Sequence, residues 1–294
     1  MKKLCVWALA AMMTVGATGA MADHLDDIKA KGKLVVGSEV SFAPFEFYFV
    51  GEDGKEYEAG FEMELARQIA ADIGVELEVS DQQFNGLIPA LQNGDVDLVL
   101  SGMTATEERK NAVDFSSTYY VGEQPIVVRE ADLDTYKTAE DLKGKTIGAQ
   151  LATIQQTIAE EQFPDSELLL LPTVPTLLME LLNGNIEGVV CSKIVATSYM
   201  NIYPGLAFSE VPVESNKNGV GVAVAKGDEN ATLLAAVNET VERVVADGTY
   251  DGRKGLRAKC RAAQGAGRGA VSAKSSSVRA VRRKPGRLFS RLWG

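Results

Sequence analysis

The 294-residue sequence predicts an α/β protein of two lobes, each built on a mainly parallel sheet with crossover helices. Apolar runs of strand length alternate with segments whose apolar residues recur at helical spacing. The helix stop and strand of residues 93–101 recur ninety positions later at 183–191, once in each half. Chance similarity of two ordinary αβ turns is the alternative explanation. Residues 219–225 form a further strand pattern, so the chain can leave one lobe, build the other and return.

The first 22 residues have the pattern of a secretory signal peptide. Lys2 and Lys3 form a positively charged start, residues 4–15 are apolar, and the Ala-Met-Ala sequence at 20–22 is a small-x-small cleavage signal. A membrane anchor is the alternative, but the apolar run is shorter than the roughly 20 residues that a spanning helix needs. We therefore expect cleavage after Ala22 and an exported, soluble protein.

Charge divides the rest of the chain into two parts. Residues 23–251 carry 15 Lys and Arg against 40 Asp and Glu, whereas residues 252–294 carry 13 basic residues and no acidic one. The acidic body argues against binding of nucleic acid or of an anionic membrane by that body. The Gly-, Ala-, Ser- and Arg-rich tail has no periodic apolar face, so we expect it to be disordered. The alternatives are a nucleic-acid or membrane arm, or the product of a frameshift or fusion near Asp251.

Cysteine and histidine exclude several classes of site. After cleavage only Cys191 and Cys260 remain, too few and too distant for a disulfide framework or a metal cluster. The single histidine, His24, lies at the expected new N-terminus, where we predict it to be solvated. No serine therefore has a histidine to activate it, and no phosphate-binding Gly loop is present. We expect neither a cofactor nor a metal.

Each element of the first unit has its own local signal. The EDGK sequence at residues 52–55 is a hairpin turn, Gly74 and Gly94 stand where helices stop, and Thr106 can cap a helix whose first turn carries two glutamates. The predicted elements are strands at 33–37, 45–50, 75–79 and 96–100, and helices at 61–73, at 87–93 and from 107.

The second unit has the same alternation. Residues 138–141 resemble a capping box, in which a threonine and an acidic residue three positions later satisfy each other's backbone amides. The predicted elements are strands at 125–128, 146–150, 168–171 and 187–191, and helices at 153–162 and 176–182. A strand at 219–225 and a helix at 230–247 then return the chain to the first lobe. Two crossings of this kind, at 124–128 and 219–225, permit closure on a ligand.

Residues 84–120 have the layout of a binding edge. A polar loop at 101–106 leaves a buried strand, and Arg109 lies one helical turn further on, so its guanidinium can reach back over the loop. An arginine beside hydroxyls and loop amides suits a carboxylate, which accepts two parallel hydrogen bonds from it. The alternative is a surface arginine paired with Glu108 or Asp114.

Five other residues are candidates, and three of them have a plainer alternative. Phe42 and Phe84 are aromatic residues in loops, which either clamp a ligand or belong to the core. Glu39, at the end of the first strand, either holds a ligand cation or is a solvated surface carboxylate. Gln150 and Thr153 stand at the start of a helix in the second unit, where free backbone amides favour anions.

Six motifs follow one another in a combination that is specific. They are GSEVSFAPFE (37–46), GFEMEL (60–65), FNGLIPAL (84–91), SGMTATEER (101–109), DFSSTYY (114–120) and DLKGKTIG (141–148). Together they resemble the periplasmic solute-binding proteins of polar amino-acid ABC importers, the type 3 extracellular solute-binding family. The resemblance covers residues 23–251.

This resemblance implies the two-lobed type II periplasmic binding protein fold, with two parallel-type sheets joined by a two-strand hinge. It assigns residues 23–124 and 219–251 to lobe 1 and residues 125–218 to lobe 2. It further implies a monomeric periplasmic receptor, not an enzyme, which takes a small amino acid or a similar carboxylate and delivers it to an inner-membrane ABC permease. Closure would be a population shift, because contacts from both lobes favour the shut state.

The resemblance also assigns roles to single residues. Phe42 and Phe84 would sandwich the ligand side chain. An acid at the position of Glu39 is typical of members that take cationic side chains, which favours arginine or lysine. The residues that would grip the α-carboxylate are Ser101, Gly102, Met103, Thr104 and Arg109.

The second lobe departs from the family pattern. The usual Gly-Thr-Thr is Ala152-Thr153-Ile154, and Ser192 stands where an aspartate normally holds the α-ammonium. Ser192 otherwise simply caps the helix that follows. A buried ammonium without a carboxylate loses its charged partner, so ordinary α-amino acids would bind weakly. The alternatives are a ligand without a standard α-amino group, or compensation by Glu187 or Glu39.

An enzyme on this scaffold, such as a dehydratase that acts on a carboxylate, is the second hypothesis. Such an enzyme needs an acid–base group in the cleft with a shifted pKa, and Glu39 is the obvious candidate.

Overall fold

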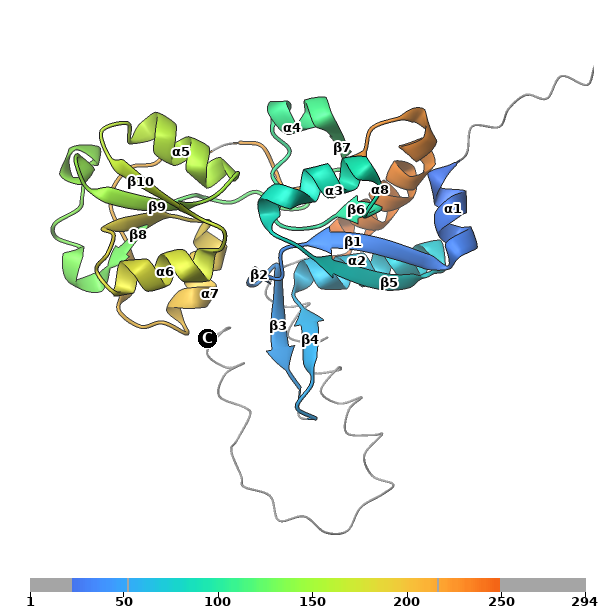
Figure 1. Cartoon of the computed structure of the whole chain (residues 1–294), viewed down its shortest axis with the longest axis horizontal. Coiled ribbons are helices and arrows are strands. Elements are labelled where there is room, and N and C mark those ends of the chain that lie inside the picture. Colours follow the sequence, from blue (N-terminus) through green and yellow to red (C-terminus); the bar gives the residue numbers. More distant parts are fainter. Residues whose placement is uncertain (1–22, 52, 216, 249–294) are drawn as a thin grey trace, which may run out of the picture.

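The computed structural model of the chain describes residues 23–51, 53–215 and 217–248. Its elements form two lobes, and a small three-stranded sheet projects from the first of them (Figure 1). The two-lobed α/β fold is therefore confirmed. The signal-peptide and tail predictions lie outside the described residues. Among the described residues, no helix has both the length and the apolar character needed to cross a membrane.

The first lobe is built on a five-stranded sheet. Its strand order is β5 (Glu76–Asp81), β1 (Lys33–Ser38), β6 (Leu98–Val99), β13 (Ala223–Ala225) and β7 (Val113–Phe115). Strand β1 runs parallel to β5 and β6, whereas β13 pairs antiparallel with both β6 and β7. The predicted return of the chain to the first lobe is thus a central strand of its sheet.

The second lobe repeats this plan. Its strand order is β10 (Glu167–Leu171), β9 (Thr146–Gln150), β11 (Gly188–Val190), β8 (Ile126–Arg129) and β12 (Leu206–Phe208). Strand β9 is parallel to β10 and β11, and β8 is antiparallel to β11 and β12. Each sheet is therefore mixed, because four of its strands run in one direction and the fourth in the spatial order, β13 or β8, runs in the opposite direction.

Helices cover these sheets and bury their apolar faces. In the first lobe they are α1 (His24–Lys31), α2 (Phe61–Ile73), α3 (Leu87–Asn93), α4 (Glu107–Ala112) and α8 (Ala231–Ala246), and in the second α5 (Ile154–Gln162), α6 (Val174–Leu182) and α7 (Lys193–Met200). Short 3-10 turns are η1 (Phe84–Gly86), η2 (Glu130–Asp132), η3 (Ala139–Leu142) and η4 (Asp228–Asn230). Leu65 and Ile69 of α2 pack with Val237 and Val241 of α8 in one buried cluster, which fixes both helices on the sheet.

The local signals in the sequence do what their chemistry predicts. The Thr106 hydroxyl accepts a hydrogen bond from the Arg109 backbone N–H at 3.2 Å and so begins α4. Gly74 and Gly94 end their helices in the left-handed conformation, which glycine adopts without a Cβ clash. The predicted capping box of Thr138 and Asp141 is present, although it opens a 3-10 turn rather than an α-helix.

Two features differ from the predictions. His24 was expected to be solvated, but it lies in α1 with Nε2 2.8 Å from Asp97 Oδ1 and Nδ1 2.7 Å from Asn230 Oδ1. Asp23 caps this helix by accepting a hydrogen bond from the Leu25 backbone N–H at 3.0 Å. The loop after β1 contains a further short strand, which forms the small sheet of β2 (Ser41–Phe42), β3 (Glu46–Val50) and β4 (Glu56–Ala59).

Two connections without regular structure in their described residues join the lobes, one at residues 116–125 and one at residues 209–215 and 217–222. They touch through an isolated antiparallel bridge between Tyr120 and Val220. Of the predicted crossing strands, 124–128 and 219–225, only residues 126–128 and 223–225 lie in the sheets, and the crossings themselves are irregular. Such segments can absorb a change in backbone angles when two lobes rotate.

Candidate functional site

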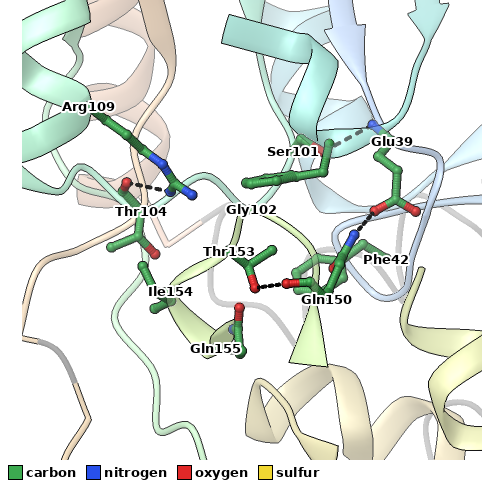
Figure 2. A pocket seen from close by; sticks show the side chains of 11 residues that line it. Glu39, Phe42, Ser101, Gly102, Thr104, Arg109, Gln150, Thr153, Ile154 and Gln155 are labelled. Carbon is green, nitrogen blue, oxygen red and sulfur yellow. Dashed lines mark hydrogen bonds between the residues drawn. The ribbon is translucent and has the colours of Figure 1, made fainter. Parts of the chain in front are cut away.

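A cavity of about 20 Å³ lies between the lobes, where β1, β6 and β9 end (Figure 2). Open α/β sheets place ligands at these strand ends. The cavity brings together every predicted site residue except Met103 and Ser192. Its lining is Glu39, Phe42, Phe84, Ser101, Gly102, Thr104, Arg109, Gln150, Thr153, Ile154 and Gln155.

Arg109 spans the gap between the lobes. Its guanidinium donates to the Thr104 carbonyl at 2.9 Å and, across the cavity, to the Ala152 carbonyl at 2.9 Å. The guanidinium carbon lies 5.2 Å from the centre of the Phe84 ring, a cation–π contact that fixes its plane. Burial lowers the pKa of Arg109 to about 10. Arg109 is therefore a cleft residue and not a surface residue paired with Glu108 or Asp114, and its donors now bind carbonyls that a carboxylate can replace.

Glu39 is the carboxyl group of the cavity and only 5% exposed. Gln150 donates to its Oε2 at 2.6 Å, and the Ser41 hydroxyl donates to its Oε1. Burial raises the pKa of Glu39 to about 7, and the charge of Asp81 adds to this rise. Glu39 is consequently not a solvated surface residue, and its charge changes near neutral pH.

The amino end of α5 supplies the second-lobe wall. Thr153 caps this helix by accepting from the Gln156 backbone N–H at 3.4 Å, while its hydroxyl donates to the Gln150 carbonyl at 2.6 Å. Ala152 has φ 62°, a left-handed conformation that explains why a glycine is usual at this position. Ile154 and Gln155 also line the cavity. Neither was predicted as a site residue, although both follow Thr153 directly at the start of the helix.

The two phenylalanines line the cavity and also belong to the buried core. Each is 9% exposed and lines the cavity, yet Phe42 also stacks on Phe45 at a centroid distance of 5.5 Å. Gly102 has φ 57°, and a Cβ on it would lie 2.7 Å from a Phe42 ring carbon. Only glycine therefore allows this ring to lie against the loop. The Gly102 backbone N–H donates to Glu62 rather than into the cavity.

Met103 and Ser192 lie outside the cavity lining. Met103 is 1% exposed and packs in the core beneath the loop. Ser192 is buried at the N-cap position of α7, where its side chain makes no capping bond and instead hydrogen-bonds to Tyr120. Glu187 accepts from the Thr146 backbone N–H at 2.9 Å, at the end of β9 opposite Gln150. Of the two carboxylates considered as substitutes for the missing aspartate, only Glu39 is therefore near the cavity.

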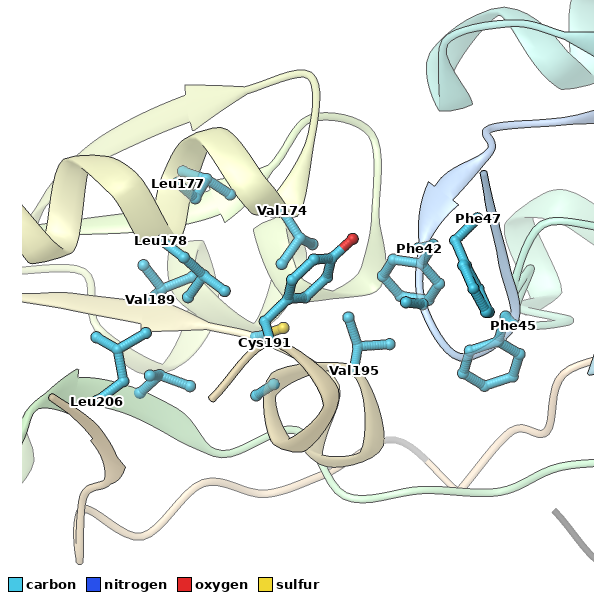
Figure 3. Close-up of a cluster of buried hydrophobic side chains, with 14 of the residues drawn as sticks. Phe42, Phe45, Phe47, Val174, Leu177, Leu178, Val189, Cys191, Val195 and Leu206 are labelled. Carbon is cyan, nitrogen blue, oxygen red and sulfur yellow. The ribbon is translucent and has the colours of Figure 1, made fainter. Parts of the chain in front are cut away.

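Contacts between the lobes extend beyond the cavity. The Tyr199 hydroxyl of α7 donates to the Ser41 carbonyl of β2 at 2.6 Å. One apolar cluster spans both lobes, with Phe42, Phe45 and Phe47 on one side and residues that include Val174 and Val195 on the other (Figure 3). These contacts hold the lobes together. A cavity of about 20 Å³ has room for about one water molecule. A solute can therefore enter only when the two lobes rotate apart about the irregular connections that join them.

Comparison with known proteins identifies the family to which this chain is similar. The model for bacterial extracellular solute-binding proteins, family 3, matches residues 34–254. The arginine-binding extracellular protein ArtP of Bacillus subtilis is 34% identical over 232 residues, which cover 78% of this chain and 88% of that protein. The L-cystine-binding protein TcyJ of Escherichia coli K12 is 31% identical over 255 residues, with coverage of 82% and 91%.

A solved structure is similar as well. It is that of the amino acid ABC transporter substrate-binding protein AbpA from Streptococcus pneumoniae bound to L-arginine, with a TM-score of 0.75 and 35% identity over 81% of this chain and 98% of that one. Three of the six motifs, at residues 37–46, 84–91 and 101–109, contribute side chains to the cavity lining. The chain therefore belongs to the family 3 bacterial extracellular solute-binding proteins.

Proposed function

We propose that this protein is a monomeric periplasmic receptor that binds an amino acid with a cationic side chain, arginine first, and presents it to an inner-membrane ABC permease. The observation that carries the proposal is the pair of Arg109 and Glu39, which face one small buried cavity from opposite sides (Figure 2). A guanidinium matches a ligand carboxylate, and a buried carboxylate matches a ligand cation. The names of the similar proteins, two of which bind arginine, support the same choice.

The remaining lining suits the part of the ligand between its two charges. Phe42 and Phe84 offer apolar ring surface for an aliphatic chain, and Thr104 adds a hydroxyl group beside Arg109. Gln150 already donates to Glu39, so a ligand cation would compete with that amide for the carboxylate. Closing the lobes removes water from both ends of the ligand and strengthens both charge pairs.

Binding of purified protein to L-arginine, L-lysine, L-histidine and L-cystine, measured by isothermal titration calorimetry, tests the proposal. We expect L-arginine to bind with one site per chain. Arg109→Ala should abolish this binding, whereas Arg67→Ala, which removes a surface ion pair with Glu64, should leave it unchanged. Retained affinity in Arg109→Ala would contradict the assignment of the carboxylate.

The same sample tests the enzyme alternative. If Glu39 acts as an acid–base catalyst in a dehydratase, chromatography after long incubation will detect consumption of a bound carboxylate. We expect the solute to be recovered unchanged.

The lobe boundaries and the export signal belong to the proposal too. We assign residues 23–124 and 219–251 to one lobe, residues 125–218 to the other, and the mature N-terminus to Asp23. Asp23 caps α1 and accepts a hydrogen bond from the Thr232 hydroxyl at 2.5 Å. These contacts belong to the folded protein, which supports Asp23 as the first residue of the mature chain. Mass spectrometry of the exported chain measures the cleavage position directly.

A further inference from the structure

Two acidic residues outside the cavity lining are completely buried. Glu46 begins β3, Glu62 lies in the first turn of α2, and each has 0% of its surface exposed. Burying a carboxylate costs several kcal/mol when nothing compensates it. Neither carboxylate forms an ion pair with a basic side chain within the described part of the chain, so hydrogen bonds must compensate.

Glu62 has the environment of an ionised carboxylate. Its two oxygens accept from the Gly102 backbone N–H at 3.0 and 2.9 Å, and the Tyr119 hydroxyl donates to Oε1 at 2.6 Å. The helix dipole at the amino end of α2 also favours a negative charge. These donors oppose the effect of burial on the pKa of Glu62.

Glu46 has the environment of a protonated carboxyl group. Its Oε1 accepts from the Ser101 hydroxyl at 3.1 Å, while Oε2 has no partner of the kind that a negative charge needs. The Glu62 carboxyl group faces Glu46, and a hydrogen bond between two carboxyl groups requires a proton on one of them. Burial, with the charges of Glu62 and Glu39, raises the pKa of Glu46 well above its ordinary value. The pair therefore carries one proton, on Glu46.

This pair is connected directly to the cavity. Ser101 donates to Glu46 and accepts from the Glu39 backbone N–H at 3.0 Å, and the next residue, Gly102, is bound to Glu62. Hydrogen bonds with the two buried carboxyl groups thus fix Ser101 and Gly102. Ser101 in turn fixes the backbone of Glu39. The titratable groups that face the pair from neighbouring elements are Glu39 and Tyr119.

We propose that Glu46 and Glu62 act as a single-proton unit that positions the Ser101–Gly102 loop and Glu39, and that loss of this proton at alkaline pH weakens solute binding. Deprotonation breaks the bond between the two carboxyl groups and places a second negative charge beneath the loop. Glu46 and Glu62 are positioning residues, because neither lines the cavity. The binding part of this inference rests on the proposed function.

Thermal unfolding without solute tests where the proton lies. Gln at position 46 imitates a protonated Glu, since its amide can donate to Glu62 and accept from Ser101. We expect E46Q to unfold at the same temperature as the wild type near pH 4 and at a higher temperature near pH 9, because Glu46 in the unfolded wild type ionises above pH 4.5 and Gln does not. E62Q should unfold at a lower temperature throughout. The matched control is E64Q, which changes an exposed residue of the same helix.

The opposite order, with E62Q tolerated and E46Q destabilised or unfolded, would overturn the assignment. Infrared spectroscopy of the wild type gives a second measurement that needs no variant to fold. We expect the carbonyl stretch of a protonated carboxylic acid to persist at neutral pH after Glu39 is replaced by Gln. Its absence would equally overturn the proposal.

Titration with L-arginine between about pH 6 and 10 separates positioning from simple stability. We expect the affinity of the wild type to fall at the alkaline end and that of E46Q to stay level, with E62Q about tenfold weaker at pH 7 because it loses charge-assisted hydrogen bonds. Parallel pH profiles for the wild type and E46Q would refute the positioning role. If none of these proteins binds L-arginine, the proposed function fails, and the unfolding and infrared measurements still decide the state of the pair.

Discussion

Gln150 of the second lobe donates a 2.6 Å hydrogen bond to the carboxylate of Glu39 in the first lobe. This bond crosses the cavity that we assign to the solute, so the same carboxylate serves closure and recognition. Glu39 is also the residue in the cavity whose charge is least settled at neutral pH, because burial raises its pKa to about 7. The first two predictions follow from this contact.

Replacing Glu39 by Gln should stabilise the solute-free protein at pH 8 and leave its stability unchanged near pH 4. The folded pKa lies above the ordinary 4.5, so ionisation opposes folding as pH rises from 4.5 to about 7. A shift of this size corresponds to an upper value of about 3 kcal/mol. Denaturant unfolding at the two pH values measures the difference. The same variant should bind L-arginine more weakly, and unchanged affinity would remove Glu39 from the cation site.

Arginine binding at pH 7 should release protons. A guanidinium next to Glu39 favours its ionised form, and about half of the Glu39 carboxyls are protonated at a pH equal to the pKa. Calorimetry in two buffers of different ionisation enthalpy should therefore detect about half a proton released per arginine. The matched control is Glu39→Gln, for which the release should disappear. Equal heats in both buffers for the wild type would show that the cation binds elsewhere.

Gly102→Ala should abolish binding and destabilise the protein. The residue has φ 57°, and its new Cβ would lie 2.7 Å from Phe42, so the ring or the loop must move. The control is Gly94→Ala, which has φ 75° but nothing within 4 Å of the new Cβ. Each left-handed alanine costs about 1 kcal/mol from backbone strain alone. The decrease in the unfolding temperature should consequently be larger for Gly102→Ala than for Gly94→Ala. Similar decreases would mean that the Phe42 ring moves aside at little cost.

Ser192→Asp should tighten the binding of ordinary α-amino acids. Ser192 is 4% exposed and hydrogen-bonds to Tyr120, so a carboxylate there would lie in a dry environment beside the second-lobe wall. The comparison of L-arginine with its analogue that lacks the α-amino group isolates this effect. The two ligands should bind similarly to the wild type and differ in the variant. If the variant does not separate them, the ammonium group lies elsewhere.

Replacing His24 by Gln should reduce stability below about pH 6 and have little effect at pH 8. The hydrogen bond with Asp97 raises the pKa of His24 above 6.5, and that with Asn230 adds to the rise, against the effect of burial. Because the folded pKa is raised, this stabilisation is complete below the unfolded pKa and is lost as pH rises through the folded one. Thermal unfolding as a function of pH measures the difference between the two proteins. A constant difference would indicate packing alone.

Local patterns predicted much of this protein. The Thr106 cap, the Gly94 stop and the loop between them depend on neighbouring residues, so the position of Arg109 over the loop followed from the sequence. The sequence also predicted that Glu39 and Phe42 belong to the site. Both follow the first strand closely, and strand ends of this kind face the cleft.

Other features depend on contacts between distant segments. The burial of Glu46 beside Glu62 was not predicted, although both residues lie in the quoted motifs. No local sequence rule predicts that two carboxyl groups are buried together. His24 was expected to be solvated since its partners, Asp97 and Asn230, are 73 and 206 residues away. Ser192 was assigned to the site from the family pattern alone, and its side chain turns to Tyr120 instead.

The contact of Tyr199 with Ser41 and the apolar cluster around Phe42 include no solute atom. If the protein is the receptor proposed above, these contacts favour the same closed shape with and without a bound solute. The permease would then have to distinguish the solute-bound receptor from the solute-free one by the lifetime of the closed form. A long-lived closed form without solute would lead to transport cycles that carry nothing. Removing the hydrogen bond of Tyr199 would therefore change the efficiency of uptake, although Tyr199 does not line the cavity.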